Sequence, residues 1–263
     1  MAKAARYVEI GWGDLGLACL LVVFTLLLSR RQKLGLERSL LVGSVRAFLQ
    51  LLAVGYVLKA VFDLHQWYWT LLMLGVMTAV AVWTAAGRER KSYPRALPIL
   101  AVAIGGGSFL ALGFVVGAVI RPPDWYSPQY AVPIGGMIIG NAMTGAVLLL
   151  DRLRSEVSAR RTQVEAALCL GATSRQAVAG PLRSAVRAAM TPSLSSMMIV
   201  GVVQLPGMMT GQILAGAAPE QAIRYQIVVV YMISTAVALT SILAAGLAYR
   251  QLFTDAHQLL DMP

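Results

Sequence analysis

The stretch Glu165-Ala-Ala-Leu-Cys-Leu-Gly-Ala-Thr173 lies within the one long charged segment of this 263-residue sequence, residues 151–187. On both sides of that segment, long apolar runs alternate with short basic loops. Hydrophobic residues make up 58% of the chain and charged residues 13%, whereas soluble domains carry roughly 25% charged residues. The mean hydropathy is +0.70. The composition therefore predicts a polytopic integral membrane protein and excludes an ordinary soluble domain.

Seven runs approach the roughly 20 apolar residues that a spanning helix needs. They are residues 12–29, 39–62, 67–86, 97–120, 128–150, 188–214 and 225–249. Because open sheet edges are not stable in lipid, we predict an all-α fold with about seven transmembrane helices, forming a single permease domain over residues 1–263. The sixth run is irregular, since residues 188–205 give only ~27 Å of helix before Pro206 must kink or end it.

The basic residues are divided unevenly between the two ends of the predicted helices. One end carries Arg30, Arg31, Lys33, Arg38, Arg88, Arg90, Lys91, Arg95, Arg152, Arg154, Arg160, Arg161, Arg175, Arg183, Arg187 and Arg250. The other end carries Lys3, Arg6, Lys59, Arg121 and Arg224. The positive-inside rule places the first set in the cytoplasm, so seven spans leave the N-terminus outside and the C-terminus inside. Topology and contact with lipid headgroups then explain the net charge of +10, and nucleic-acid binding is not indicated.

The charged segment, residues 151–187, has the pattern of a helix, a tight turn and a short second helix. The apolar positions of the first helix share one face, within about 60° on a helical wheel. They are Leu153, Val157, Val164 and Leu168. Gly171 is expected to end this helix, since glycine readily adopts the left-handed conformation of a helix terminator. Thr173 and Gln176 have the spacing of a capping box, which begins a new helix that Pro181 limits.

Part of this segment carries a specific resemblance. Glu165, Ala166, Ala167 and Gly171, followed by Ala172, resemble the E-A-A-x-x-x-G element in the coupling loop of ABC transporter permeases. Downstream, GATSRQAVAGPLRSAVRAAMTPSLSSMMIVGVVQLPGMMTGQILAG and RYQIVVVYM are similar to the FetB-type (YbbM-like) permease family. Bacterial members of that family are linked to iron export, and plant relatives to aluminium tolerance. The resemblance covers nearly the whole chain.

The resemblance implies a transporter permease subunit and not an enzyme, with iron or another metal ion as the exported substrate. Its coupling loop would dock into a separate ATP-binding subunit and transmit the closure of that subunit. The sequence contains no G-x-x-x-x-G-K-[ST] motif, so ATP and Mg would be bound by the partner and no cofactor by this chain. Two permease and two ATPase subunits are implied, which makes the permease a homodimer in a plasma membrane, the inner membrane if the source is bacterial.

Other interpretations remain open at this point. E-A-A is also simply good helix-forming sequence. The residues before Pro181, Ala179 and Gly180, depart from the I-x-L-P ending of importer coupling loops, so import is not supported. The cargo of an ABC permease could instead be a nucleotide sugar such as UDP-glucose. A third alternative is a channel or secondary carrier that works without a motor.

Polar side chains inside the predicted spans are candidates for lining a transport pathway, because such groups are costly in lipid and often functional. They are Arg46, Gln50, Asn141, Thr144, Gln204, Thr210 and Gln212. Arg46 fits a structural ion contact equally well, and Asn141 fits a hydrogen bond between helices.

Metal ligands are scarce in the sequence. Met208 and Met209 are weak candidates, since thioethers suit cuprous copper better than iron and hydrophobic packing explains both residues as well. Cys19 and Cys169 lie far apart in the sequence and form no ligand motif. The residues alone therefore indicate no metal, and only the resemblance points to one.

Overall fold

The computed structural model is entirely helical in the part of the chain that it describes, residues 11–63, 66–89, 93–122, 124, 126–254 and 256–260. Extended backbone pairing over these ranges is limited to two isolated bridges, Val200 with Gln204 and Phe253 with Leu259. The predicted all-α fold is confirmed.

The chain divides into two compact units, each described by itself below. The first comprises residues 1–65 and 214–216, and the second comprises residues 66–213 and 217–263. The first unit contains a helical hairpin of α1 (Trp12–Arg31) and α2 (Glu37–Asp63). Its turn is fixed by Ser29, whose Oγ donates a 3.0 Å hydrogen bond to Oε1 of Glu37. The prediction of a single permease domain stays a prediction.

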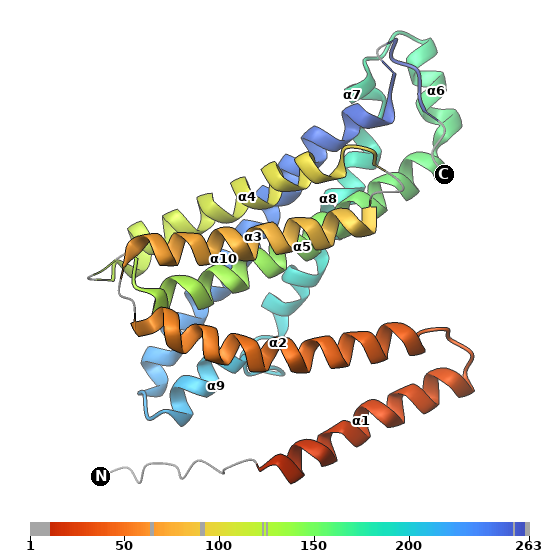
Figure 1. The fold of residues 1–263 in the computed structure, drawn as a ribbon. Coiled ribbons are helices and arrows are strands. Elements are labelled where there is room, and N and C mark those ends of the chain that lie inside the picture. Colours follow the sequence, from red (N-terminus) through yellow and green to blue (C-terminus); the bar gives the residue numbers. More distant parts are fainter. Residues whose placement is uncertain are drawn as a thin grey trace. The chain divides into compact units, whose positions relative to one another are not determined.

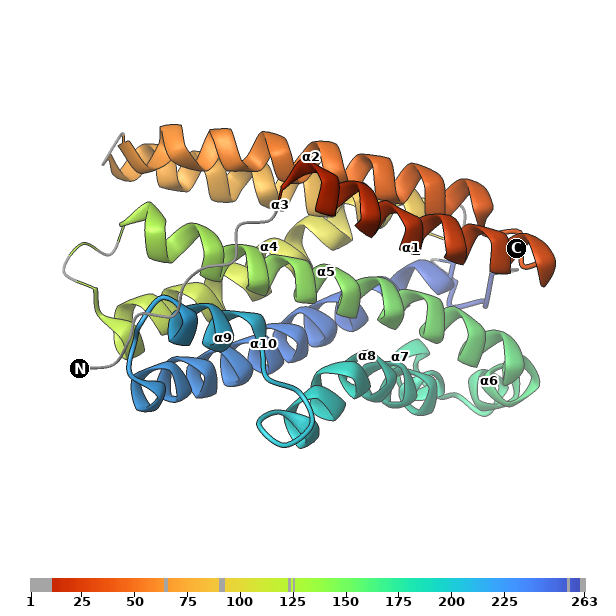
Figure 2. The same cartoon turned by 90° about the horizontal axis from the view of Figure 1, so that it is seen from below.

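The second unit is a helical bundle. Its elements are α3 (Trp67–Glu89), α4 (Ala96–Phe114), the π-helical η1 (Val115–Ile120), α5 (Pro128–Ala159), α6 (Arg161–Cys169), α7 (Ser174–Ala177), α8 (Ala179–Ile199), α9 (Gly207–Leu214), α10 (Pro219–Ala248) and the 3-10 turn η2 (Tyr249–Leu252). Helix α5 packs against α3, α4, α8 and α10, and buries Ile138 and Leu149 completely. Figure 1 shows α6 and α7 at one end of this bundle, and Figure 2 shows the beginning of α9 at the opposite end.

Glycines allow α10 to lie close to its neighbours. A Cβ atom on Gly107 of α4 would stand 2.8 Å from the backbone nitrogen of Thr240. A Cβ atom on Gly145 of α5 would stand 2.9 Å from Cγ1 of Val237. Because real Cβ atoms do not approach so closely, α4 and α5 can pack on α10 in this way only where they carry glycine.

Six helical segments are long and apolar enough to cross a membrane in the described ranges. They are Gly13–Arg31, Glu37–Val57, Trp67–Glu89, Ala96–Ile120, Pro128–Ala159 and Pro219–Leu252. Large apolar side chains such as Leu17, Leu110 and Ile242 are exposed on them, as on surfaces that face lipid. The protein is therefore an integral membrane protein. The count of seven spans is not confirmed, because residues 188–214 do not form one helix, and the orientation of the termini stays a prediction.

Candidate functional site

The charged segment begins within a helix that is longer than the sequence indicated. Helix α5 continues past Leu150 to Ala159, since residues 151–159 contain neither glycine nor proline. The chain bends at Arg160, and α6 follows at once. The apolar face of this segment is confirmed: three of its residues are buried and Leu168 packs against the core. The three buried residues are Leu153, Val157 and Val164.

Gly171 ends α6 as predicted. Its φ is +87°, its N–H donates to the Leu168 carbonyl at 3.0 Å, and the Ala172 N–H donates to the Ala167 carbonyl at 3.0 Å. These two bonds form a Schellman motif, in which glycine at the left-handed position satisfies the last carbonyls of the helix.

The predicted capping box is also confirmed. The Thr173 N–H donates to Oε1 of Gln176 at 2.9 Å, and the Gln176 N–H donates back to Oγ1 of Thr173. The expected limit at Pro181 is wrong. Helix α7 ends at Ala177, and Pro181 lies in the first turn of α8, where proline is tolerated because the missing N–H has no partner within the helix.

The residues predicted to contact an ATPase lie in α6 and in the turn that follows it, and Figure 1 shows α6 at one end of the bundle. Ala166, Cys169, Leu170 and Gly171 are exposed, with Leu170 at 89%, and we call these four the α6–α7 surface. Glu165 is half-buried beside them and forms a 2.7 Å ion pair with Nε of Arg161. Ala167 and Ala172 are partly covered. An exposed leucine and small neighbours form a surface that a protein groove can cover.

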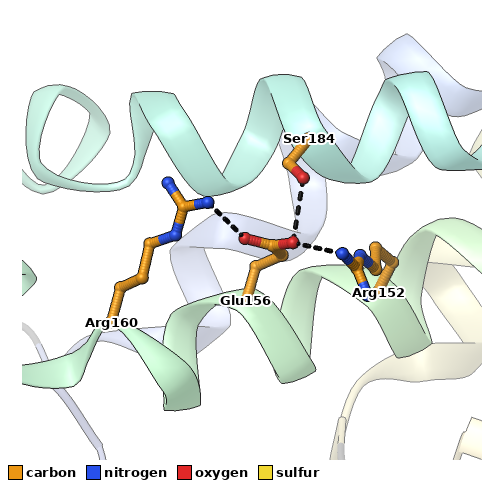
Figure 3. Close-up of polar contacts among 4 residues, drawn as sticks. All are labelled: Arg152, Glu156, Arg160 and Ser184. Carbon is orange, nitrogen blue, oxygen red and sulfur yellow. Dashed lines mark hydrogen bonds and ion pairs between the residues drawn. The ribbon is translucent and has the colours of Figure 1, made fainter.

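A carboxylate that the sequence analysis did not single out joins α5 to α8. Glu156 is 7% exposed, and its two oxygens contact Arg152 at 2.6 Å and Arg160 at 3.0 Å. Ser184 of α8 donates a 2.9 Å hydrogen bond to Oε1 of Glu156 (Figure 3). The spacing of the bases, four residues before and after the acid, was the available signal. The buried carboxylate fixes α8 to α5 near the α6–α7 surface.

Two further contacts hold loops at this end. The hydroxyl of Tyr93, between α3 and α4, donates to the Leu150 carbonyl at 3.1 Å, and burial raises the pKa of this phenol. Ser174 at the start of α7 lies 2.7 Å from Nδ1 of His257, so the end of the chain contacts the charged segment.

The opposite part of α8 ends in a break within the predicted sixth span. The helix stops at Ile199, earlier than the Pro206 position expected, because Gly201 adopts a φ of +85° and can end the helix there. The Gly201 N–H then donates to the Gln204 carbonyl at 2.9 Å, which closes a tight turn before α9.

A cavity of about 320 Å³ lies beside this break, between α5, α8 and α10. Three predicted candidates line it: Asn141, Gln204 and Met208. Sequence reasoning missed its other polar and sulfur-bearing residues: Met137, Ser193, Ser196, Met197, Gln226 and Ser234. No acidic or basic side chain is among the residues that line it in the described part of the chain.

The cavity offers neutral oxygen and sulfur atoms. Ser193 and Ser234 contact each other through their Oγ atoms at 2.8 Å, and Ser234 also contacts Sδ of Met197 at 3.0 Å. Nδ2 of Asn141 donates to the Met137 carbonyl of its own helix, and an interhelical hydrogen bond of Asn141 is not found among the described residues. Oε1 of Gln226 is buried and has no hydrogen-bond partner among the described residues. A buried amide oxygen of this kind is costly and is a candidate to meet a ligand.

The remaining candidates lie elsewhere. Arg46 and Gln50 are exposed on α2 in the first unit. Thr144 and Thr210 donate to the Gly140 and Pro206 carbonyls, respectively. The cavity residues do not include Gln212, although its Oε1 is buried without a partner in the described ranges. Met209 lines a neighbouring hollow of about 440 Å³, apart from Met208.

Clusters of metal-binding side chains are not found in the described residues, where no three His, Cys, Asp or Glu residues come together. Cys19 and Cys169 are both free and exposed. The two predicted methionines line different hollows, so the structure does not bring Met208 and Met209 together around one of them.

The chain is similar to known membrane proteins along almost its whole length. It is 39% identical over 253 residues to a UPF0014 membrane protein of Synechocystis sp., covering 96% of this chain and 98% of that protein. It is 39% identical over 250 residues to the probable iron export permease protein FetB of Escherichia coli, covering 94% of each. It is 36% identical over 242 residues to the protein ALUMINUM SENSITIVE 3 of Arabidopsis thaliana, covering 92% and 87%. No solved structure matches the chain.

One protein family matches most of the chain. The match covers residues 12–253, which include all the spans, the α6–α7 surface and the cavity. The predicted kinship with FetB and its plant relatives is confirmed by the identities above. The chain therefore belongs to the uncharacterised protein family UPF0014.

Proposed function

We propose that this protein is the permease subunit of an ATP-driven ABC transporter that exports iron from the cytoplasm. The observation that carries the proposal is the 39% identity, over 94% of each chain, to a protein named as a probable iron export permease. At that identity and coverage the two chains are expected to share one fold. This chain has no ATP-binding motif, and the proposal therefore requires a separate ATPase subunit.

Exposure of the E-A-A element supports docking of the ATPase at the α6–α7 surface. Leu170 is 89% exposed at the tip of the turn, and Ala166 gives the helix a surface without bulk. Glu165 keeps its carboxylate on the same helix, held toward Arg161. A groove in the partner that receives Leu170 would bury an apolar side chain, which stabilises a complex by about 1.5–3 kcal/mol.

Helix α8 provides a mechanical link between this surface and the cavity. It starts directly after α7 and ends at Ile199, 21 residues or about 30 Å away. Glu156 and Ser184 fix its first half to α5, while Ser193 and Met197 in its second half line the cavity. Movement of α6 and α7 by a closing ATPase would therefore displace the wall of the cavity.

The cavity supports a substrate that exchanges part of its hydration shell for neutral ligands. Iron prefers oxygen and nitrogen donors, and Asn141, Gln226 and the three serines that line the cavity supply oxygen. The methionines Met137, Met197 and Met208 add sulfur atoms, which suit softer cations. The absence of carboxylates among the described lining residues favours weak binding and release, as transport requires.

The assembly that we propose has two copies of this permease and two ATPase subunits in the plasma membrane, which is the inner membrane in a bacterium. Cys169 offers a direct test, because it lies on the α6–α7 surface. In a Cys19→Ser variant, a crosslinker with one thiol-reactive group and one photoactivated group is expected to join Cys169 to a P-loop ATPase in native membranes.

Transport is tested in proteoliposomes that contain the permease with the ATPase that the crosslink identifies, without the crosslinker. ATP-dependent movement of ferrous iron supports the proposal. Stimulation of the ATPase by UDP-glucose and not by iron would assign the nucleotide-sugar cargo instead. Movement of iron without ATP and without an ATPase would show a channel or carrier, and would overturn the proposal.

A further inference from the structure

A groove of about 610 Å³ lies between α8 and α10, and Arg175 of α7 is among the residues that line it. It is separate from the cavity beside the helix break, and it shares no residue with it. One end of the groove is basic and the other is apolar. A groove with one basic and one apolar end is suited to a ligand that has an anionic part and an apolar part.

The basic end carries four arginines: Arg175, Arg183, Arg187 and Arg250. All four side chains are exposed, and none forms an ion pair with an acidic residue that the structure describes. Four cations around one hollow repel one another, and the repulsion is relieved when an anion binds among them. Guanidinium groups are particularly suited to phosphate, because they donate two parallel hydrogen bonds.

The apolar end is formed by Met190 and Leu194 of α8 and by Ile242 and Gly246 of α10. Leu194 is 40% exposed and Ile242 is 60% exposed, so the described residues leave this part of the groove open. A Cβ atom on Gly246 would meet nothing within 4 Å, which shows that the glycine leaves open space there. Ile242 and Gly246 lie in the candidate span Pro219–Leu252, so this part of the groove can take up an apolar chain.

The two ends are separated by a distance that matches one leaflet of a bilayer. Arg183 and Leu194 are eleven steps apart on α8, which is ~17 Å at 1.5 Å per residue. Half of a hydrocarbon core of ~30 Å is about 15 Å. A single molecule with an anionic head and an apolar chain as long as one leaflet fits both ends of the groove.

We propose that this groove is a binding site for an anionic phospholipid. The phosphate lies among the four arginines, and one acyl chain lies along Leu194, Ile242 and Gly246. Basic hollows between membrane helices are suited to such headgroups, and each added arginine strengthens the attraction. Arg175 belongs to α7, so the bound headgroup contacts the segment that includes the α6–α7 surface.

Native mass spectrometry of the full-length protein, titrated with dioleoyl phosphatidylglycerol or dioleoyl phosphatidylcholine, tests the site. The unmodified protein is expected to retain the anionic lipid in preference to the zwitterionic one. The double variant Arg183→Gln/Arg187→Gln is expected to weaken retention of phosphatidylglycerol by about thirtyfold. Arg95→Gln, at an exposed arginine outside the groove, is the matched control and is expected to leave retention unchanged.

Gly246→Leu separates a lipid from a soluble anion, since it fills the apolar end and keeps every arginine. Phosphatidylglycerol is expected to lose affinity in this variant, while glycerol 3-phosphate is expected to show no strong binding to either protein. Equal retention of both lipids by the unmodified protein would overturn the proposal. The proposal also fails if glycerol 3-phosphate binds as tightly as the lipid, or if Gly246→Leu retains phosphatidylglycerol fully.

Discussion

Ser184 of α8 donates a 2.9 Å hydrogen bond to Glu156 of α5, and this contact joins the two helices near the exposed end of the bundle. Glu156 is 7% exposed and is also held by Arg152 and Arg160. The contact lies between the α6–α7 surface and the cavity along α8. We therefore expect this hydrogen bond to stabilise the bundle and to take part in the proposed transmission of movement.

Removing this hydrogen bond is expected to lower the melting temperature of the purified protein. Ser184→Ala leaves the carboxylate with one donor fewer, and a shift of about 2–4 °C is expected for a chain of this size. Asp151→Asn is the control, because its ion pair with Arg154 is exposed and such pairs contribute little. An unchanged melting temperature in Ser184→Ala would show that α8 is fixed by other contacts.

Changes at the α6–α7 surface are expected to uncouple the protein without preventing its insertion. Gly171→Val forces a β-branched residue into a φ of +87°, and Glu165→Lys replaces the ion pair with Arg161 by repulsion. Stimulation of the ATPase by the permease is expected to fall by about tenfold, since left-handed backbone costs roughly 1–2 kcal/mol without glycine.

The control for that experiment is Gly180→Ala, at a glycine in the first turn of α8. Its Cβ atom would meet only Nη1 of Arg160, at an ordinary contact distance of 3.7 Å. If Gly171→Val and Glu165→Lys stimulate the ATPase as strongly as Gly180→Ala does, the docking site is elsewhere.

Gln226 in the cavity is expected to lower the stability of the protein and to be required for transport. Its Oε1 has no partner among the described residues, so Gln226→Leu removes a buried polar atom and should raise the melting temperature by about 2–4 °C. Iron transport is expected to fall strongly in the same variant, because the cavity loses an oxygen ligand.

Gln212→Leu provides the matched comparison. Gln212 also has a buried and unpartnered Oε1 in the described ranges, but it does not line the cavity. This variant is expected to gain stability and keep its transport rate. Equal transport by both variants would remove Gln226 from the pathway.

Two neighbouring glycines of α4 are expected to differ in their tolerance of alanine. Gly107→Ala places a Cβ atom 2.8 Å from the Thr240 backbone and should destabilise the protein by about 1–3 kcal/mol. Gly105→Ala meets nothing within 4 Å and should be neutral or stabilising by about 0.4–1 kcal/mol. Thermal unfolding in detergent measures both, and equal stabilities would contradict the close packing of α4 on α10.

The local elements of the charged segment were predicted from sequence because they are made by short-range contacts. Gly171 and the pair Thr173 and Gln176 form their bonds within a few residues, so spacing alone is sufficient. The sequence analysis predicted the break in the sixth span at Pro206, which is later in the chain than the structure has it. Proline at 206 gave the stronger signal, but Gly201 ends the helix first.

The sequence by itself determined that the protein is helical and that it is an integral membrane protein. It also determined where the E-A-A element and the turn after it lie. These features depend on hydropathy and on the spacing of glycine, threonine and glutamine. Such signals involve only residues that are close together in the chain. Only the tertiary structure decided which polar groups meet. Gln226 joins Asn141 and Ser193 in one cavity, and Ser184 meets Glu156, because helices far apart in the chain pack side by side. Such contacts depend on the rotation of each helix about its axis, which packing of the whole bundle fixes.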